Sequence, residues 1–422
     1  MIPELRARFN SQYSPDGYVR LLEILRERCR VTVEFRVAET PVFFKRRMLD
    51  EIAAAGAHLA KSLIANPQYL EVARQAIPKE FLVPGEEEHP NFLTADFALV
   101  RDGSGELTPK LVEIQAFPSV YGYQAVLACA YREAYGIDPE LGRYLCGIDD
   151  TSYWKLLTKT VLGKLDPENV VLTEIDPLHQ KTRPDFEVTS RKLGIAVVDI
   201  TTIEAIGDRL HYRNAMGKLV PIHRIYNRAI ADELIARQIR LPFDITKRWN
   251  VEWAGNPNWY FLISKFSIPW LTREEGANSV VPPAVFLDEF MGGDGKERLR
   301  AAGVDVPRDA RGETVYRNLL LKPLFSFAGK GIQFDPTQAE LEAIPRERRR
   351  DFLLQERMSF VHNIDTPCGM TQAEIRILYL WPDDGILKPV LPLVRLGRGK
   401  MMGVDHNRNQ EWVGASAAFI ES

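Results

Sequence analysis

The segment from Leu319 to Ile332 most constrains what this chain can fold into. Leu319-Leu-Leu-Lys322-Pro has the apolar composition of a buried strand, yet it carries a lysine. A lysine in such a strand must find an anion or lose free energy on leaving water. The loop that follows carries four residues suited to an anion: Ser326, Gly329, Lys330 and Gly331. Glycines let backbone N–H groups close on an anion, and phosphate is the best candidate.

The segment is not a standard nucleotide-binding motif, and it has a second interpretation. Its spacing matches neither a Walker loop nor the glycine motif of a dinucleotide-binding βαβ unit. A surface hairpin with a solvated Lys330 and a snorkelling Lys322 would carry the same residues. The apolar residues before Lys322 make that second interpretation weaker for Lys322 than for Lys330.

Length and charge place the chain among ordinary globular proteins. Its 422 residues allow two or three domains or one composite enzyme, and its formal net charge is −3. That charge gives no sign of a nucleic-acid or membrane partner. No stretch is long and apolar enough for a spanning helix, and the four cysteines form no CxxC or Cys/His cluster. We therefore expect a cytoplasmic protein that acts on small molecules.

The residue patterns predict a mixed α/β (α+β) fold in four parts. Residues 1–85 read as a helical N-terminal region, and 86–150 as a β-hairpin followed by a helix. Residues 151–240 alternate short apolar runs with a helix, which indicates a small α/β subdomain with a parallel sheet. The fourth part, 241–422, is rich in strands from about residue 318 onward.

The predicted hairpin offers a set of oxygen ligands. Glu113 and Gln115 are two residues apart on one strand, so they share a face, and Asp96 on the preceding strand can lie opposite them. Two carboxylates and an amide oxygen suit Mg²⁺, which takes its remaining ligands from phosphates and water. An exposed strand face with ordinary polar residues is the alternative.

Two later motifs carry further candidates. Phe352-Leu-Leu-Gln355-Glu356 could offer backbone groups to an adenine edge and a carboxylate to a ribose hydroxyl. The glycine-rich tail contains three arginines able to stabilise phosphate charge, or to form structural ion pairs: Arg376, Arg395 and Arg398. Asp405 and Asn407 form a further oxygen pair on one face.

Taken in order, these motifs resemble the ATP-grasp superfamily, and within it the glutathionylspermidine synthase-like, rearranged branch. In that branch an Asp and a Glu-x-Asn pair precede the nucleotide lysine, as Asp96 and Glu113-Ile-Gln115 precede Lys322 here. Lys265 occupies the place of another family lysine. Two departures stand out: Gln115 replaces the family's Asn, and Thr94 replaces an arginine two residues before the metal Asp.

The resemblance implies an ATP-grasp architecture and a carboxylate–amine ligase that uses ATP and Mg²⁺. It implies metal ligation by Asp96, Glu113 and Gln115, and catalytic roles for Arg376, Arg398 and Lys322. It also implies a set of nucleotide-binding residues: Lys265, Lys322, Ser326, Gly329, Lys330, Gly331, Gln355 and Glu356. The substrates would be a small-molecule or peptide carboxylate and an amine.

Several points stay open at this stage. The same residues could run phosphotransfer to a hydroxyl, because that reaction also needs positioning and charge stabilisation. Thr94 and Gln115 would also fit a nucleotide-binding protein without catalysis. The substrate pocket has only candidate residues, in the turn 117–123 and in the α/β part: Asp185, Arg224, Tyr226 and Arg228.

Overall fold

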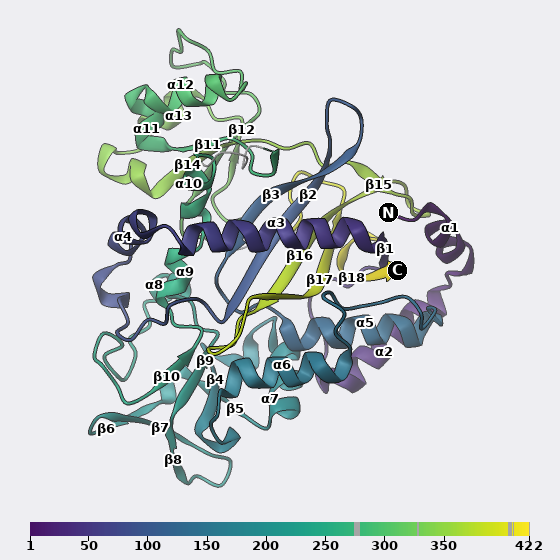
Figure 1. Cartoon of the computed structure of the whole chain (residues 1–422), viewed down its shortest axis with the longest axis vertical. Coiled ribbons are helices and arrows are strands. Elements are labelled where there is room, and N and C mark those ends of the chain that lie inside the picture. Colours follow the sequence, from purple (N-terminus) through teal and green to yellow (C-terminus); the bar gives the residue numbers. More distant parts are fainter. Residues whose placement is uncertain (274–278, 327–328, 404–406, 408, 422) are drawn as a thin grey trace.

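The structure is a computed structural model that describes residues 1–273, 279–326, 329–403, 407 and 409–421. Within these residues a mixed sheet of seven strands forms the centre of the molecule (Figure 1). Its order is β1 (Val42–Lys45), β18 (Gly414–Glu421), β17 (Lys388–Gly397), β16 (Thr371–Leu380), β2 (Phe92–Arg101) and β3 (Leu107–Gln115), with β15 (His362–Ile364) paired to β16. Neighbours run antiparallel except β1, which is parallel to β18.

Helices cover both faces of this central sheet. The long helix α3 (Arg46–Ile64) lies across one face, over β2, β3, β16 and β17 (Figure 1). On the other face α5 (Tyr121–Tyr135) packs on β17 and β18, and α2 (Pro15–Cys29) packs on α5. The remaining N-terminal helices are α1 (Pro3–Gln12) and α4 (Pro67–Gln75).

The parallel sheet expected in residues 151–240 is present. It has the order β10 (Glu252–Ala254), β9 (Arg224–Asn227), β4 (Val170–Glu174) and β5 (Ala196–Asp199), all parallel. Helices α6 (Asp150–Leu162), α7 (Arg183–Leu193) and α8 (Ala231–Ala236) belong to this region. An antiparallel meander extends it: β6 (Glu204–Ile206), β7 (Arg209–Arg213) and β8 (Leu219–Ile222).

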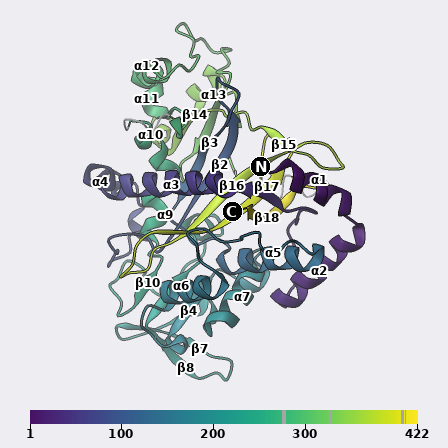
Figure 2. The same cartoon turned by 45° about the vertical axis from the view of Figure 1, so that its right-hand side comes forward.

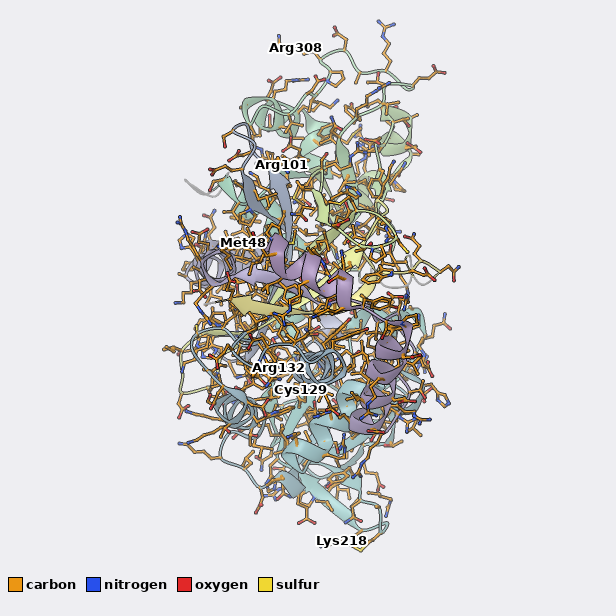
Figure 3. All side chains as sticks on the ribbon, turned by 90° about the vertical axis from the view of Figure 1, so that its right-hand side faces the viewer. Met48, Arg101, Cys129, Arg132, Lys218 and Arg308 are labelled. Carbon is orange, nitrogen blue, oxygen red and sulfur yellow. The ribbon has the colours of Figure 1, made fainter. Side chains whose placement is uncertain are left out.

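A smaller antiparallel sheet lies at the opposite end of the molecule. It has the order β11 (Ala284–Phe286), β14 (Phe352–Glu356), β12 (Leu319–Pro323) and β13 (Gln333–Phe334). The helices around it are α9 (Asn258–Leu262), α10 (Ile268–Leu271), α11 (Leu287–Gly292), α12 (Asp294–Ala301) and α13 (Gln338–Ala343). Figure 2 shows the same separation of the two smaller sheets after a turn of the molecule. In Figure 3, Arg308 and Lys218 mark these two ends.

The predicted fold class is confirmed, but several strands were not predicted, among them β1, β18 and the meander β6–β8. The hairpin, the parallel strands and the strand-rich end of the chain lie where the residue patterns place them. The N-terminal region is mostly helical, but it also supplies β1 to the central sheet. Four residues are too few to reveal a strand by alternation, and the partner strand β18 is at the far end of the chain.

The division at residues 85, 150 and 240 stays a prediction, and strands from three of those four segments share the central sheet. No helix in the described part of the chain is both long and apolar enough to cross a membrane.

Strand alternation gives the central sheet two different faces. The odd-numbered residues of β2, Leu93, Ala95, Phe97 and Leu99, join the core under α3. The even-numbered positions face the other way, and there Phe92 packs with Tyr121 of α5. Further along the same face, Asp96 takes the place of an apolar residue. One half of this face is therefore core, and the other half is polar.

Packing of α3 on the sheet depends on a glycine. Gly56 faces the sheet, where a Cβ would overlap the hydroxyl of Tyr379 and approach the Ala95 Cβ to 3.0 Å. Tyr379 is fully buried and donates a hydrogen bond to the Ala53 carbonyl at 2.9 Å. The tyrosine therefore has little freedom to move away.

Gly56→Ala should lower the free energy of unfolding by about 1–3 kcal/mol, because overpacking outweighs the better helix propensity of alanine. Denaturant unfolding followed by circular dichroism would measure the loss. Tyr379→Phe removes the overlapping hydroxyl, so the double variant should lose less than the sum of the single losses. Additive losses, or a gain in Gly56→Ala, would show that the contact is not tight.

Candidate active site

A large cavity lies between the polar half of the central sheet and the two smaller sheets. Its volume is about 1120 Å³. The central sheet contributes Glu113, Gln115, Glu374, Arg376 and Arg395 to its wall. Other contributors include Lys322 from β12, Lys265, Glu174 at the end of β4, Arg228, and the segments 357–360 and 398–403. A cavity this size can hold a nucleotide and a second small molecule.

A bulge in β3 turns Glu113 toward this cavity. Asp96 pairs with Glu113 whereas Phe97 pairs with Leu111, so Val112 is an extra residue on β3. Such bulges re-aim side chains next to functional sites. As a result Val112, Glu113 and Gln115 all line the cavity, while Leu111 and Ile114 stay in the core under α3.

Charged residues of both signs lie close together on the neighbouring strands β3, β2, β16 and β17. Asp96 pairs in register with Glu113 on one side and with Arg376 on the other. Arg376 binds both Asp96 oxygens, with Nε–Oδ1 at 2.5 Å and Nη2–Oδ2 at 2.6 Å. Arg395 also donates to Asp96 Oδ2 and lies 2.5 Å from Glu374. Opposite charges side by side on one sheet face stabilise each other, more strongly where water is excluded.

The balance of these charges differs between the two cavity carboxylates. Burial alone would raise the pKa of Glu113, but the cations Lys265, Arg376, Arg395 and Lys322 hold that pKa at about 2. Burial raises the pKa of Glu374 to about 7, and nearby Asp96 and Glu113 oppose the lowering effect of Arg395. Burial would lower the pKa of Arg376, but Asp96 raises it above its ordinary value. Glu113 is therefore a fixed negative charge.

Two buried lysines face these carboxylates across the cavity. Lys265 lies 3.4 Å from Glu113 and donates to the Ser326 carbonyl. Lys322 is 4% exposed, and its ammonium donates to Gln355 Oε1 at 2.6 Å. Burial lowers the pKa of Lys322 to about 8, against the attraction of Glu113. The prediction that Lys322 lies in a buried strand is thus confirmed, and its charge lacks the bulk water that would stabilise it.

The glycine loop reaches the cavity from the smaller antiparallel sheet. Gly329 and Lys330 line it, and Gly329 and Gly331 have φ values of 73° and 74°, which favour glycine. Ser326 Oγ is buried and has no hydrogen-bond partner among the described residues. Residues 327 and 328 lie outside the described residues. The loop therefore brings backbone groups and a cation to the cavity.

Other predicted residues lie off the cavity wall. Asp96 and Gln355 are 1% and 0% exposed and sit behind it. Glu356 follows Gln355 and so lies on the opposite face of β14, near Lys110. Arg398 lines the cavity but donates to the Glu411 carbonyl at 2.9 Å and Thr366 Oγ1 at 3.2 Å, away from the Asp96 cluster.

Of the predicted oxygen pair Asp405 and Asn407, the structure describes one residue. Asp405 lies outside the described residues. Asn407 is buried and donates to the carbonyls of Met401 and Gly403, each at 3.1 Å. It thereby fastens the segment 401–403, which lines the cavity. Thr94, the departure from the family pattern, is buried and pairs with Gln115.

Of the candidate substrate residues in the α/β part, one lines the cavity and the others make structural contacts. Arg228 lines the cavity, where its guanidinium donates to the Ser119 carbonyl and lies 3.3 Å from Asp185. Asp185 is buried and accepts the backbone N–H of Tyr123 at 2.9 Å. Arg224 pairs instead with Glu252 and Asp383, and Tyr226 packs on Phe92. Tyr121 and Tyr123 belong to the core.

Sequence reasoning missed three cavity carboxylates, Glu174, Glu233 and Glu374. Glu374 shares a face with Arg376 inside an otherwise apolar strand, which is a signal the sequence carries. Glu174 ends β4, beside the point where β9 ends. Ligands of open parallel sheets bind at such carboxyl ends, but a single glutamate there has no distinct sequence pattern.

Comparison with known proteins identifies the fold. No family model and no curated protein sequence matches the chain. Among solved structures, a glutathione synthetase-like effector from Globodera pallida, in its apo form, aligns with a TM-score of 0.55 at 12% identity, over 97% of this chain and 100% of that one. A putative γ-glutamylcysteine synthetase from Methylobacillus flagellatus KT aligns over 86% of each chain at 13% identity, with a TM-score of 0.41. The chain thus has a glutathione synthetase-like, ATP-grasp-type fold.

The buried Glu174 should make the free energy of unfolding depend on pH. Burial raises its pKa to about 8, although Arg228 acts in the opposite direction. The folded state then keeps a proton that the unfolded state loses, so stability falls as pH rises from about 5 to 8. Glu174→Gln should remove this fall and gain up to a few kcal/mol at pH 8 relative to pH 5. Urea unfolding of both proteins at several pH values would measure it.

The matched control is Glu168→Gln, an exposed glutamate just before the same strand. That variant should follow the pH dependence of the unchanged protein. Parallel pH curves for the unchanged protein and Glu174→Gln would contradict the shifted pKa.

Proposed function

We propose that this chain is an ATP- and Mg²⁺-dependent ligase that joins a carboxylate to an amine through an acyl phosphate. The observation that carries the proposal is the convergence of two buried lysines, Lys265 and Lys322, on the carboxylate-lined wall of one large cavity. The glutathione synthetase-like fold supports it. The motif order further favours the glutathionylspermidine synthase-like branch.

The residues present fit the groups that the reaction needs. Glu113 and Gln115 offer carboxylate and amide oxygens at the cavity surface, the ligand type that Mg²⁺ takes together with phosphate and water. When bound, Mg²⁺ neutralises charge on the β- and γ-phosphates. Asp96 was predicted to join these ligands. Among the described residues no group of three or more His, Cys, Asp or Glu side chains is arranged to hold a metal ion.

Each remaining group has a physical task in this proposal. Lys265 and Lys322 bind phosphate oxygens. Phosphate gives an ionic partner to Lys322, whose ammonium donates to the neutral oxygen of Gln355. Arg376 and Arg398 stabilise charge as the phosphoryl group moves. Ser326, Gly329, Lys330 and Gly331 are assigned to the phosphates, where they would help to exclude water from a hydrolysable intermediate. The β14 backbone beside Gln355 is assigned to the nucleoside. The Glu356 carboxylate, expected to bind a ribose hydroxyl, is not assigned to it, because Glu356 lies on the opposite face of β14.

The second substrate would bind at the far end of the cavity. Arg228, Lys181 and Arg237 line that end together with Glu174 and Glu233. Paired cations and carboxylates suit a small molecule or peptide that carries both a carboxylate and an amine. Such a ligand would place its carboxylate within reach of the phosphates.

The reaction class is tested by incubating the protein with Mg-ATP, carboxylates and amines. Formation of ADP together with an amide product, seen by mass spectrometry, is the expected result. A phosphorylated alcohol would instead identify a kinase on the same fold. Tight nucleotide binding without turnover of any mixture would identify a binding protein.

Glu113→Ala should reduce turnover about a thousandfold or more, because a fixed charge at the metal and phosphates is lost. The protein should stay folded, since Glu113 lies at a cavity wall. ADP release measures turnover and a thermal melt reports folding. Near-full activity in a folded variant would remove Glu113 from the metal site.

Lys322→Ala should weaken ATP binding about tenfold or more, which corresponds to about 1.4 kcal/mol. Isothermal titration with a non-hydrolysable ATP analogue measures the affinity. Lys218→Ala is the matched control, because Lys218 is exposed at the far end of the molecule (Figure 3). Equal nucleotide affinity in Lys322→Ala and Lys218→Ala would argue against a phosphate role for Lys322.

A further inference from the structure

Asp96 lies behind the cavity wall and not on it. Its side chain is 1% exposed, and the residues that line the cavity on the neighbouring strands are Glu113, Glu374, Arg376 and Arg395. Both arginines stand between the Asp96 carboxylate and the cavity contents. A cation in the cavity would meet Glu113 and Glu374 before it met Asp96.

The Asp96 oxygens are already engaged. Arg376 forms a two-pronged contact with both of them, at 2.5 and 2.6 Å, and Arg395 donates a further hydrogen bond to Oδ2. A carboxylate has about four lone-pair directions, and the two guanidinium groups occupy three of them on Asp96 with fixed geometry. Mg²⁺ demands near-octahedral geometry, for which a carboxylate that is 1% exposed and bound to two guanidinium groups leaves little room.

The same contacts fix where the two guanidinium groups point. Arg376 lies directly opposite Asp96 in the sheet, and its remaining Nη1 donates to Ser119 Oγ at 3.2 Å, on the cavity wall. Arg395 lies between Asp96 and Glu374 and contacts both carboxylates. Without Asp96 each arginine would be free to turn toward Glu113 or Glu374, of which Glu113 lies 3.6 Å from Arg376.

We infer that Asp96 is a positioning residue that holds Arg376 and Arg395 at the cavity wall, and that it is not a ligand of the metal. The inference rests on the proposed function, and it reassigns the role that the motif pattern predicts for Asp96. The oxygen ligands from the protein are then Glu113 and Gln115, with Glu374 as the nearest further carboxylate on the wall. Asp96 acts on the reaction through the arginines.

The test compares metal affinity in charge-balanced variants. Mn²⁺ binding is measured by electron paramagnetic resonance in the presence of a non-hydrolysable ATP analogue. Asp96→Asn alone leaves two uncompensated arginines, which would repel a cation whichever role Asp96 has. The informative comparison is therefore between the unchanged protein and Asp96→Asn/Arg376→Gln, which have the same net charge. The control comparison is between the unchanged protein and Glu113→Gln/Arg376→Gln, which also have the same net charge.

If Asp96 acts through the arginines, the Mn²⁺ dissociation constant of Asp96→Asn/Arg376→Gln should stay within about threefold of that of the unchanged protein. Glu113→Gln/Arg376→Gln should bind Mn²⁺ about tenfold or more weakly than the unchanged protein, because a direct ligand is lost. Turnover should also be non-additive: Asp96→Asn alone lowers kcat about a hundredfold, and adds little once Arg376 and Arg395 are both replaced by glutamine.

A tenfold or greater loss of Mn²⁺ affinity in Asp96→Asn/Arg376→Gln relative to the unchanged protein would overturn the inference and leave the proposed function standing. If the unchanged protein binds no Mn²⁺ with the nucleotide analogue, the proposed function fails and this inference fails with it. Thermal melts check folding. Should Asp96→Asn not fold while the double variant does, the ion pairing of Asp96 with Arg376 is supported directly.

Discussion

The ion-pair cluster around Asp96 is the constraint on which the rest of the site depends. Taking a carboxylate and two guanidinium groups out of water is costly unless they pair with each other and satisfy their hydrogen bonds. The central sheet meets this condition by placing Glu113, Asp96 and Arg376 in one row across three strands. The cluster therefore requires this register: a shift by one residue would turn the row into the core under α3.

The cluster also separates two regions on one face of the sheet, an apolar region that packs in the core and a polar region that forms the cavity wall. Near α5 and α6 the even-numbered positions of β2 and β16 are apolar, and Phe92, Leu378 and Leu380 pack in the core there. Toward the smaller antiparallel sheet the same alternation delivers Asp96, Glu374 and Arg376. A single pair of strands thus anchors the core at one end and forms the cavity wall at the other.

The sequence predicts those parts of this arrangement that depend on residues close together along the chain. The hairpin of Asp96 and Glu113 and the strand of Lys322 follow from alternation and turn chemistry. Asp96 and Arg376, in contrast, are far apart in sequence and become neighbours only through the pairing of β2 with β16. The predicted metal set therefore included Asp96 without the arginines that engage it. Glu174 was missed for the same reason, since its place beside Arg228 depends on parallel pairing.

The two lysines show why this cavity is more than a structural ion-pair network. A buried network made only for stability gains little over apolar packing, so each charge in it should at least be matched by an opposite one. Around Asp96 this holds, because Arg376 and Arg395 each contact two carboxylates. Across the cavity it does not: Lys322 contacts the neutral oxygen of Gln355, and burial lowers its pKa to about 8. An anion bound between Lys322 and Lys265 would supply the missing negative charge. It would thereby offset the free-energy cost of burying the charged Lys322 ammonium, and this gain would favour binding.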